Sequence, residues 1–204
     1  WHVIPLVRPG SWPRWRRDWP SGSQRSRQPS PREPGTSLSA RRRILIDGRS
    51  GSGKTELARS IAAHWPEAQL VRLDDLYPGW DGLDAGSAAV PGILTDFRWR
   101  AWDWPADRPG HWRQRDPARP TIVEGVGAIS AASRPLADLA LWVQLDDATR
   151  KQRALARDGD TYAPRWDRWA AQELRFIARE DPQALADVTI ALDADAHAGA
   201  IVEP

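Results

Sequence analysis

The 204-residue chain has no cysteine and no long apolar run. The absence of cysteine excludes a disulfide framework and thiolate metal sites, so we expect any bound metal to be held by oxygen ligands. No apolar run approaches the roughly 18 residues of a membrane-spanning helix, and the first ten residues lack the layout of a secretion signal. With 41% apolar and 27% charged residues, the composition is typical of a soluble globular protein. We therefore expect a cytoplasmic protein without membrane contacts.

Positive charge is concentrated at the N-terminus. Residues 1–43 carry ten arginines against Asp18 and Glu33, which gives +8, whereas residues 44–204 carry 19 basic and 25 acidic side chains, which gives −6. The first 40 residues are rich in arginine, proline and tryptophan and show no helical or alternating apolar period. We therefore predict a disordered tail over residues 1–40 and one folded domain over residues 41–204. We expect this tail to bind nucleic acid weakly at most.

A phosphate-binding loop is predicted directly after the first apolar run. Residues 43–47 (RILID) have the pattern of a buried parallel strand, and the glycine-rich segment GRSGSGKT follows at residues 48–55. Leu57, Ile61 and Trp65 then recur at helical spacing until Pro66. Strand, loop and helix form the context that the pattern G-x-x-x-x-G-K-[ST] requires. In a chain of this composition the match arises by chance about once in a thousand cases.

The residue types of this loop indicate how it would bind a nucleotide. Glycine lets the backbone curl so that successive N–H groups point at phosphate oxygens, and the N-terminal end of the following helix adds positive potential. Lys54 is expected to neutralise the β- and γ-phosphates, and the Thr55 hydroxyl to bind Mg²⁺. ATP and Mg²⁺ are therefore the expected cofactors. The expected nucleotide-binding residues are Gly48, Ser50, Gly51, Ser52, Gly53, Lys54 and Thr55.

Acidic residues follow the next two predicted strands. Residues 69–73 lead into Asp74 and Asp75, and residues 121–123 lead into Glu124. The carboxyl ends of parallel strands are where ligand chemistry gathers in an open α/β sheet. A carboxylate at this edge could orient an acceptor hydroxyl, accept its proton and help to hold Mg²⁺, which we expect of Asp74. From the residues alone, Asp75 remains an alternative for this role. The two aspartates could instead cap a helix or lie in a solvated turn.

Two further strands and a lid are predicted in the C-terminal half. Residues 139–145 form a fourth apolar run, and residues 188–192 a fifth after a helical stretch over about 164–179. Between them Arg150, Arg153 and Arg157 share one helical face. This stripe is either an ordinary charged surface or a lid that brings arginines over a transferring phosphoryl group. The expected fold is a parallel five-stranded α/β sheet flanked by helices.

Six segments in order resemble the uridine kinase branch of the P-loop nucleoside and nucleotide kinases. They are GRSGSGKT (48–55), DDLY (74–77), WDW (102–104), VEG (123–125), TRKQRALARD (149–158) and ADVTI (186–190). The resemblance implies a P-loop kinase domain over residues 41–204 that transfers the γ-phosphate of ATP to a hydroxyl of a nucleoside. It implies that Asp74 is the catalytic base and that Glu124 assists Mg²⁺. It also implies that Arg153 and Arg157 act from the lid, and that Tyr77, Trp102, Asp103 and Trp104 border the nucleoside.

The chain departs from this family on the acceptor side. No histidine follows the WDW segment in register, and Ala154 stands where the lid of the family often has a second arginine. The tryptophans of residues 80–112 either pack a small subdomain or form a stacking wall for a planar acceptor. One alternative function is therefore a P-loop kinase for a different small alcohol, which would differ only between Tyr77 and Trp112. The other is an ATP-switched protein that binds nucleic acid through its tail.

Overall fold

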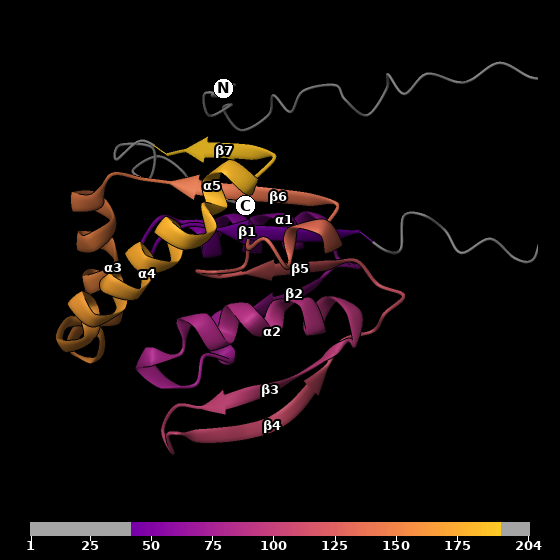
Figure 1. Ribbon diagram of the computed structural model, residues 1–204, viewed down its shortest axis with the longest axis horizontal. Coiled ribbons are helices and arrows are strands. Elements are labelled where there is room, and N and C mark those ends of the chain that lie inside the picture. The colour runs from indigo at the N-terminus through magenta and orange to yellow at the C-terminus, as the bar shows by residue number, and fades with distance from the viewer. Residues whose placement is uncertain (1–41, 193–204) are drawn as a thin grey trace, which may run out of the picture.

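The computed structural model describes residues 42–192, which form a β-sheet between helices and a separate β-hairpin (Figure 1). The predicted tail, residues 1–40, lies outside the described residues. The strands are β1 (Arg43–Asp47), β2 (Gln69–Arg72), β3 (Arg98–Asp103), β4 (Arg108–Gln114), β5 (Thr121–Glu124), β6 (Leu139–Gln144) and β7 (Val188–Ala191). The helices are α1 (Lys54–His64), α2 (Leu83–Thr95), α3 (Asp147–Tyr162), α4 (Trp166–Glu180) and α5 (Pro182–Leu185). Short 3₁₀ helices are η2 (Leu73–Asp75), η3 (Gly79–Asp81), η4 (Arg134–Leu136) and η5 (Ala163–Arg165).

The sheet is parallel, with the strand order β2-β5-β1-β6-β7. Because successive side chains of a strand point to opposite faces, Leu45 enters the core on one face, and Ile44 and Ile46 enter the core on the other. A strand that is buried on both faces needs a continuous apolar run, which is the pattern that predicted these strands. The predicted five-stranded parallel sheet is confirmed, and each strand begins and ends within one residue of its predicted position.

Helices cover both faces of the sheet. Leu57 and Ile61 of α1 pack against the cluster that contains Ile44 and Ile46. On the opposite face, α2 and α4 contribute to the cluster that contains Leu45. In Figure 1, α3 and α4 lie at the end of the sheet toward which the arrows of β6 and β7 point. Within residues 42–192, no helix is long and apolar enough to cross a bilayer.

The hairpin of β3 and β4 was not predicted. The two strands pair antiparallel, with a register shift between Arg100 and Trp102. Arg115, just after β4, fastens the hairpin to the end of α2, because its guanidinium donates to the carbonyl oxygens of Ile93 and Leu94 at 2.9 and 3.0 Å. These carbonyls have no partner within the helix, and a cation satisfies them well. The hairpin thereby stands next to α2.

Candidate active site

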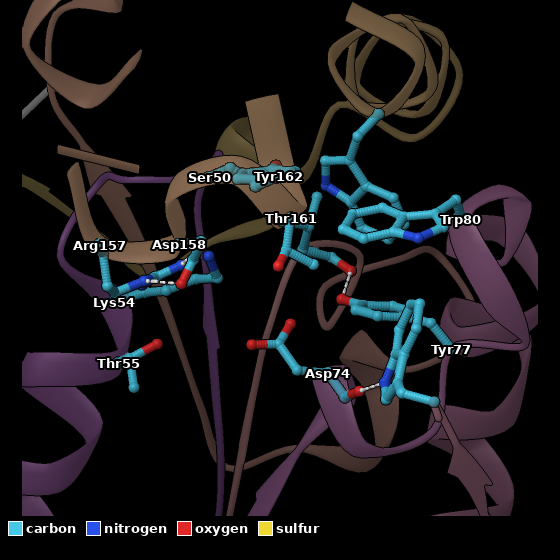
Figure 2. Close-up of a pocket in the computed structure, with 13 residues that line it drawn as sticks. Ser50, Lys54, Thr55, Asp74, Tyr77, Trp80, Arg157, Asp158, Thr161 and Tyr162 are labelled. Carbon is cyan, nitrogen blue, oxygen red and sulfur yellow. Dashed lines mark hydrogen bonds and ion pairs between the residues drawn. The ribbon is translucent and has the colours of Figure 1, made fainter. Parts of the chain in front are cut away.

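A cavity of about 430 Å³ opens at the carboxyl ends of β1, β2 and β5 (Figure 2). Its walls come from the segment after β1, from residues 74–104, from the loop after β5, and from α3 and α4. Figure 2 shows Lys54 and Thr55 on one side, Tyr77 and Trp80 on the other, and the Asp74 carboxylate between them. The lining residues are Ser50, Lys54, Thr55, Asp74, Tyr77, Trp80, Trp104, Val126, Arg157, Asp158, Thr161, Tyr162 and Trp169.

The glycine-rich loop occupies one wall of the cavity. Gly51 has φ +79°, and a Cβ at this position would overlap the backbone carbonyl oxygen of Arg150 in α3. Only glycine fits that combination of positive φ and close backbone approach. Gly53, with φ +94°, precedes α1, whose first turn has no side-chain cap. Lys54 and Thr55 follow in that turn and are buried, so the loop and the helix end offer N–H groups, an ammonium and a hydroxyl to one place.

Asp47 fixes the start of this loop and was not among the predicted site residues. Its fully buried carboxylate accepts N–H bonds from Gly48 at 2.7 Å, from Gly127 at 3.1 Å and from Ile129 at 2.9 Å. Burial raises the pKa of Asp47 from 3.8 to about 7, although these N–H donors and the charge of Lys54 act in the opposite direction. Asp47 therefore ties the glycine-rich loop to the loop after β5. The sequence signal is a carboxylate that ends an apolar strand immediately before the motif.

Glu173 of α4 holds the same loop from the other side. Its carboxylate, also fully buried, accepts the backbone N–H of Ser50 at 2.9 Å and the Nε–H of Arg49 at 3.1 Å. The Tyr162 hydroxyl at the end of α3 donates to Ser50 Oγ at 2.9 Å. The loop is thus held by residues of two helices that come more than a hundred residues later in the sequence. Nothing in the loop motif signals either partner.

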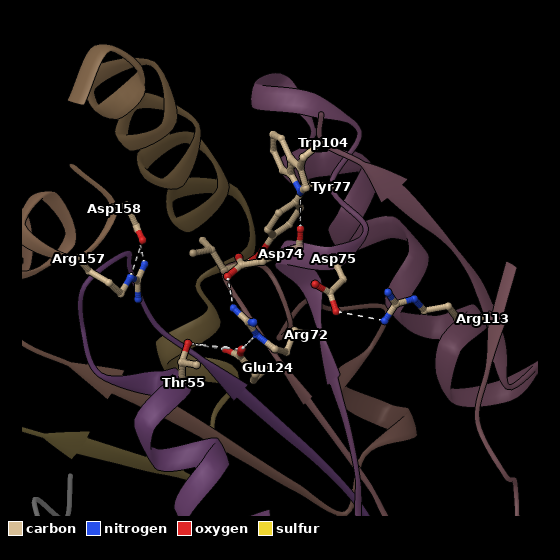
Figure 3. Close-up of polar contacts among 11 residues, drawn as sticks. Thr55, Arg72, Asp74, Asp75, Tyr77, Trp104, Arg113, Glu124, Arg157 and Asp158 are labelled. Atoms are coloured by element: carbon tan, nitrogen blue, oxygen red, sulfur yellow. Dashed lines mark hydrogen bonds and ion pairs between the residues drawn. The ribbon is translucent and has the colours of Figure 1, made fainter. Parts of the chain in front are cut away.

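The acidic residues converge with Thr55 and Arg72 (Figure 3). The Thr55 hydroxyl donates to the Glu124 carboxylate at 3.3 Å, and the Arg72 guanidinium bridges Glu124 and Asp74 at 3.2 and 3.1 Å. Burial raises the pKa of Glu124 and the charge of Asp74 adds to the rise, whereas Lys54 and Arg72 oppose it. The three residues predicted to hold Mg²⁺, Thr55, Asp74 and Glu124, therefore belong to one group of contacts.

The oxygen donors of this group fit Mg²⁺. Residues 42–192 hold no cluster of three or more His, Cys, Asp or Glu side chains that could bind a metal ion by themselves. Mg²⁺ commonly takes one or two carboxylates from the protein and completes its shell with phosphate oxygens and water. Two carboxylates and a hydroxyl beside a phosphate loop match that requirement.

The neighbouring aspartates have different surroundings. Asp74 lines the cavity, and its backbone carbonyl accepts the indole N–H of Trp104 at 2.8 Å. Asp75 does not line the cavity and is paired with Arg113 of β4 at 3.5 Å. Both residues belong to η2, a 3₁₀ helix, and β2 ends at Arg72. The alternation of side chains along a strand therefore does not explain why the two carboxylates have different surroundings. The difference follows from the contacts that each one makes.

The far wall of the cavity is aromatic. Trp80 stacks on Tyr162 at a centroid distance of 5.6 Å, lies 5.2 Å from Trp104, and meets Trp169 edge-on at 6.5 Å. Tyr77 packs edge-on against Trp169 at 4.9 Å. Several polar atoms of these rings are already used, because Tyr77 donates to the Val126 carbonyl oxygen and Tyr162 to Ser50. The wall therefore presents ring surface and few free hydrogen-bonding groups.

Only two of the four residues predicted to border the acceptor line the cavity. Tyr77 and Trp104 line the cavity, whereas Trp102 lines a second hollow of about 410 Å³ beside Asp81 and Arg168. The Asp103 carboxylate accepts the N–H of Ala106 within the hairpin turn. Trp80, Thr161 and Trp169 line the cavity and were not among the predicted site residues. Trp80 belonged to the tryptophan-rich segment, but Thr161 and Trp169 lie far along the chain from the acceptor motifs.

The predicted lid arginines also differ in position. Arg157 lines the cavity and makes a two-point contact with Asp158 at 2.9 and 2.7 Å. Arg153, one turn earlier, is not among the residues that line the cavity. Arg150 is buried, bonded to Asp147 at 2.7 Å. The helix breaks at Gly159, where φ is +51° and ψ is −137°, so the chain turns toward the cavity directly after Arg157 and Asp158.

Comparison with solved structures identifies the fold. A possible uridine kinase from Bacillus stearothermophilus matches with a TM-score of 0.52 and 18% identity over 76% of this chain and 90% of that chain. A shikimate kinase from Acinetobacter baumannii (TM-score 0.44, 18% identity, 78% and 88% covered) and a gluconokinase from Sinorhizobium meliloti 1021 (0.45, 16%, 76% and 84%) are also similar. No protein-family model and no curated protein matches the chain. The first of these likenesses shows that the chain has the fold of P-loop kinases.

Proposed function

We propose that this protein is an ATP-dependent phosphotransferase that moves the γ-phosphate of ATP to a hydroxyl of a small acceptor. One observation carries the proposal: Lys54 and Thr55 of the phosphate loop line the same cavity as the Asp74 carboxylate. A phosphate loop alone serves many nucleotide-binding proteins. Transfer to a hydroxyl also requires a carboxylate that faces this loop across the cavity.

On the donor side, the backbone N–H groups of residues 48–55 bind the phosphates and Lys54 neutralises their charge. Thr55, Glu124 and Asp74 would hold Mg²⁺, whose positive charge would stabilise the transferring phosphoryl group. Arg157 acts from the lid, and Arg153 reaches the phosphates when the lid moves. These assignments rest on the placement of Lys54, Thr55 and Arg157 around the cavity and on the contact between Thr55 and Glu124.

On the acceptor side, Asp74 serves as the general base. The acceptor hydroxyl gives its proton to the Asp74 carboxylate as the new oxygen–phosphorus bond forms, and the bond to ADP breaks. The Asp74 backbone is fixed by Trp104 and its carboxylate by Arg72, so the group needs little reorganisation when the acceptor binds.

The wall of the cavity favours a nucleoside as the acceptor. Of the residues that line it, the cations are Lys54 and Arg157, which lie on the phosphate-loop side, and Arg157 is paired with Asp158. A sugar acid or a monophosphate would find no countercharge at the aromatic end, whereas the flat base of a nucleoside stacks on Trp80 or Trp169. Similarity in fold to the possible uridine kinase supports the same choice.

The test is a coupled ATP-consumption screen of the full chain with Mg²⁺. The panel contains nucleosides, deoxynucleosides, nucleoside monophosphates, shikimate, gluconate and uncharged alcohols without a ring. We expect turnover with nucleosides and none with the acids. If an uncharged alcohol is the only compound phosphorylated, the kinase proposal stands but the acceptor is not a nucleoside. A protein that binds ATP and phosphorylates nothing in the panel, together with a Lys54→Ala variant that binds ATP equally well, would refute the kinase proposal.

A further inference from the structure

Arg72 occupies the centre of the polar site, although no motif in the sequence points to it. It is the last residue of β2, and the parallel register places it beside Glu124, the last residue of β5. Side chains in register on neighbouring strands share one face of the sheet. The Arg72 guanidinium therefore contacts Glu124 Oε1 through Nε at 3.2 Å and reaches Asp74 Oδ2 through Nη2 at 3.1 Å (Figure 3).

Arg72 contributes one positive charge to this group, in addition to the charge of the nearby Lys54 ammonium. Asp74, Glu124 and Arg72 together carry −1, and without the guanidinium the two carboxylates would carry −2. A guanidinium keeps its proton throughout the physiological pH range, so its positive charge is permanent. Its two contacts use different nitrogen atoms on one rigid plane, so it also fixes the spacing of the two carboxylates. Lysine, with one ammonium, cannot reproduce this two-point bridge.

A fixed cation beside two carboxylates discriminates between a free metal ion and a metal ion on a nucleotide. A free divalent ion would meet the full repulsion of the guanidinium in a partly buried site. An ion that arrives on a triphosphate brings negative charge that offsets this repulsion.

We propose that Arg72 is a positioning residue that fixes the Asp74 carboxylate beside Glu124 and excludes free divalent cations from this pair until nucleotide brings its own. The roles of Asp74 and Glu124 in this statement rest on the proposed kinase function. The bridge itself rests on the contacts of Arg72 and on the register of β2 and β5.

Metal binding without nucleotide tests the charge of Arg72. The full chain is titrated with Mn²⁺, which prefers the same oxygen ligands as Mg²⁺ and is followed by electron paramagnetic resonance. We expect Arg72→Gln to bind Mn²⁺ at least about tenfold more tightly than the original chain, because one repelling charge is removed. Arg72→Lys, which keeps the charge, should bind Mn²⁺ as weakly as the original chain. Equal Mn²⁺ affinity of Arg72→Gln and the original chain overturns the proposal.

Arg113→Gln is the matched control. It removes the same charge from the ion pair with the neighbouring Asp75, at 3.5 Å, outside the cavity. We expect its Mn²⁺ affinity to equal that of the original chain. An increase as large as that of Arg72→Gln would show a general effect of net charge and would also overturn the proposal. Thermal melting and circular dichroism of each variant confirm that it is folded.

Turnover tests the positioning role. We expect both Arg72→Gln and Arg72→Lys to lower kcat by at least about tenfold with the KM for ATP changed less than threefold, since neither bridges both carboxylates. Millimolar guanidinium should restore part of the loss in Arg72→Gln and should leave the turnover of Arg113→Gln unchanged. Unchanged kcat in both Arg72 variants overturns the positioning role. If the original chain phosphorylates no acceptor and Lys54→Ala binds ATP equally well, the proposed function fails, and the Mn²⁺ comparison still decides the inference about Arg72.

Discussion

In the proposed mechanism, Lys54 supplies the positive charge beside the transferring phosphate. It is buried at the phosphate loop, and the only other lysine, Lys151, lies on α3 with its side chain about half exposed. Backbone N–H groups cannot replace the ammonium on a transferring phosphate. We expect Lys54→Ala to lower kcat by about 10² to 10³, the usual loss for one electrostatic stabiliser, as measured by ADP release.

Lys151→Ala is the control for this change. Its contact with Asp167, at 3.9 Å, is exposed and weak, so turnover should change less than twofold. A folded Lys54→Ala protein that turns over at the original rate would contradict the role of the loop in phosphate transfer.

Asp74 and Asp75 provide a second comparison between neighbouring residues. Asp74 lines the cavity and Asp75 is paired with Arg113 outside it. We expect Asp74→Asn to lower the transfer rate by about 10² to 10⁴ while ATP binding changes little, because the lost carboxylate acts on the acceptor hydroxyl. Asp75→Asn should retain most of the activity. The two variants are compared at saturating ATP, and a severe Asp75 variant beside an active Asp74 variant would reverse the assignment.

Asp47 makes stability depend on pH. Burial raises its pKa in the folded protein from 3.8 to about 7. Between these values the folded state holds a proton that the unfolded state has lost, so the free energy of unfolding decreases as the pH rises, by at most about 1.4 kcal/mol per pH unit. Above about pH 7 this contribution no longer changes. Asp47→Asn has no titrating group at this position.

Urea unfolding of the original chain and of Asp47→Asn, measured between pH 5 and pH 7.5, isolates this contribution. We expect the difference in unfolding free energy, original minus variant, to fall across that range. A difference that is flat or rises with pH would contradict the raised pKa of Asp47.

At the scale of elements, the contact between α3 and the phosphate loop requires glycine at residue 51. Its φ is +79°, and a Cβ would overlap the Arg150 carbonyl oxygen. We expect Gly51→Ala to lower the stability by at least about 1 kcal/mol, because the side chain is strained at this φ and displaces α3 or the loop. ADP affinity, followed by tryptophan fluorescence, should fall by at least about tenfold, since the same loop binds the phosphates.

Gly92→Ala separates this effect from a general cost of replacing glycine. Gly92 lies within α2, and a Cβ there would meet only Asp96 Oδ2 at an ordinary 3.8 Å. Alanine favours a helix over glycine by up to about 1 kcal/mol, so this variant should be as stable as the original chain or more stable. Equal losses of ADP affinity in the two variants would show that the contact with Arg150 is not the cause.

At the scale of the whole molecule, the described site residues all lie between residues 47 and 173. Residues 41–204 carry 22 basic and 25 acidic side chains, which gives −3, whereas residues 1–40 carry +5. We therefore expect a protein of residues 41–204 to keep the transfer activity and to lose any affinity for single-stranded DNA, measured by fluorescence anisotropy. Binding by the full chain should weaken steeply with salt. Salt-sensitive binding by residues 41–204 would show that the folded part contributes a nucleic-acid surface.

The fold and the position of the glycine-rich loop could be predicted because their signals are contiguous in the sequence. A parallel strand buried on both faces needs an unbroken apolar run, and residues 43–47 and 139–144 have one. The phosphate loop needs glycine, lysine and threonine at fixed spacing within eight residues. The hairpin of β3 and β4 lacks such a run, since charged residues interrupt Arg98–Asp103 and β4 is mostly exposed.

Only the tertiary structure decided which side chains complete the site. Ser50 contacts Glu173 across 123 residues and Tyr162 across 112, and Arg72 joins Glu124 across 52. A single sequence carries no periodic signal for such pairs, because they depend on the strand order and on how α3 and α4 pack over the loop. The sequence by itself determined a parallel sheet with a phosphate loop before α1. The packing of distant elements decided that Arg72 bridges Asp74 and Glu124, and that Trp169 lines the cavity whereas Trp102 does not.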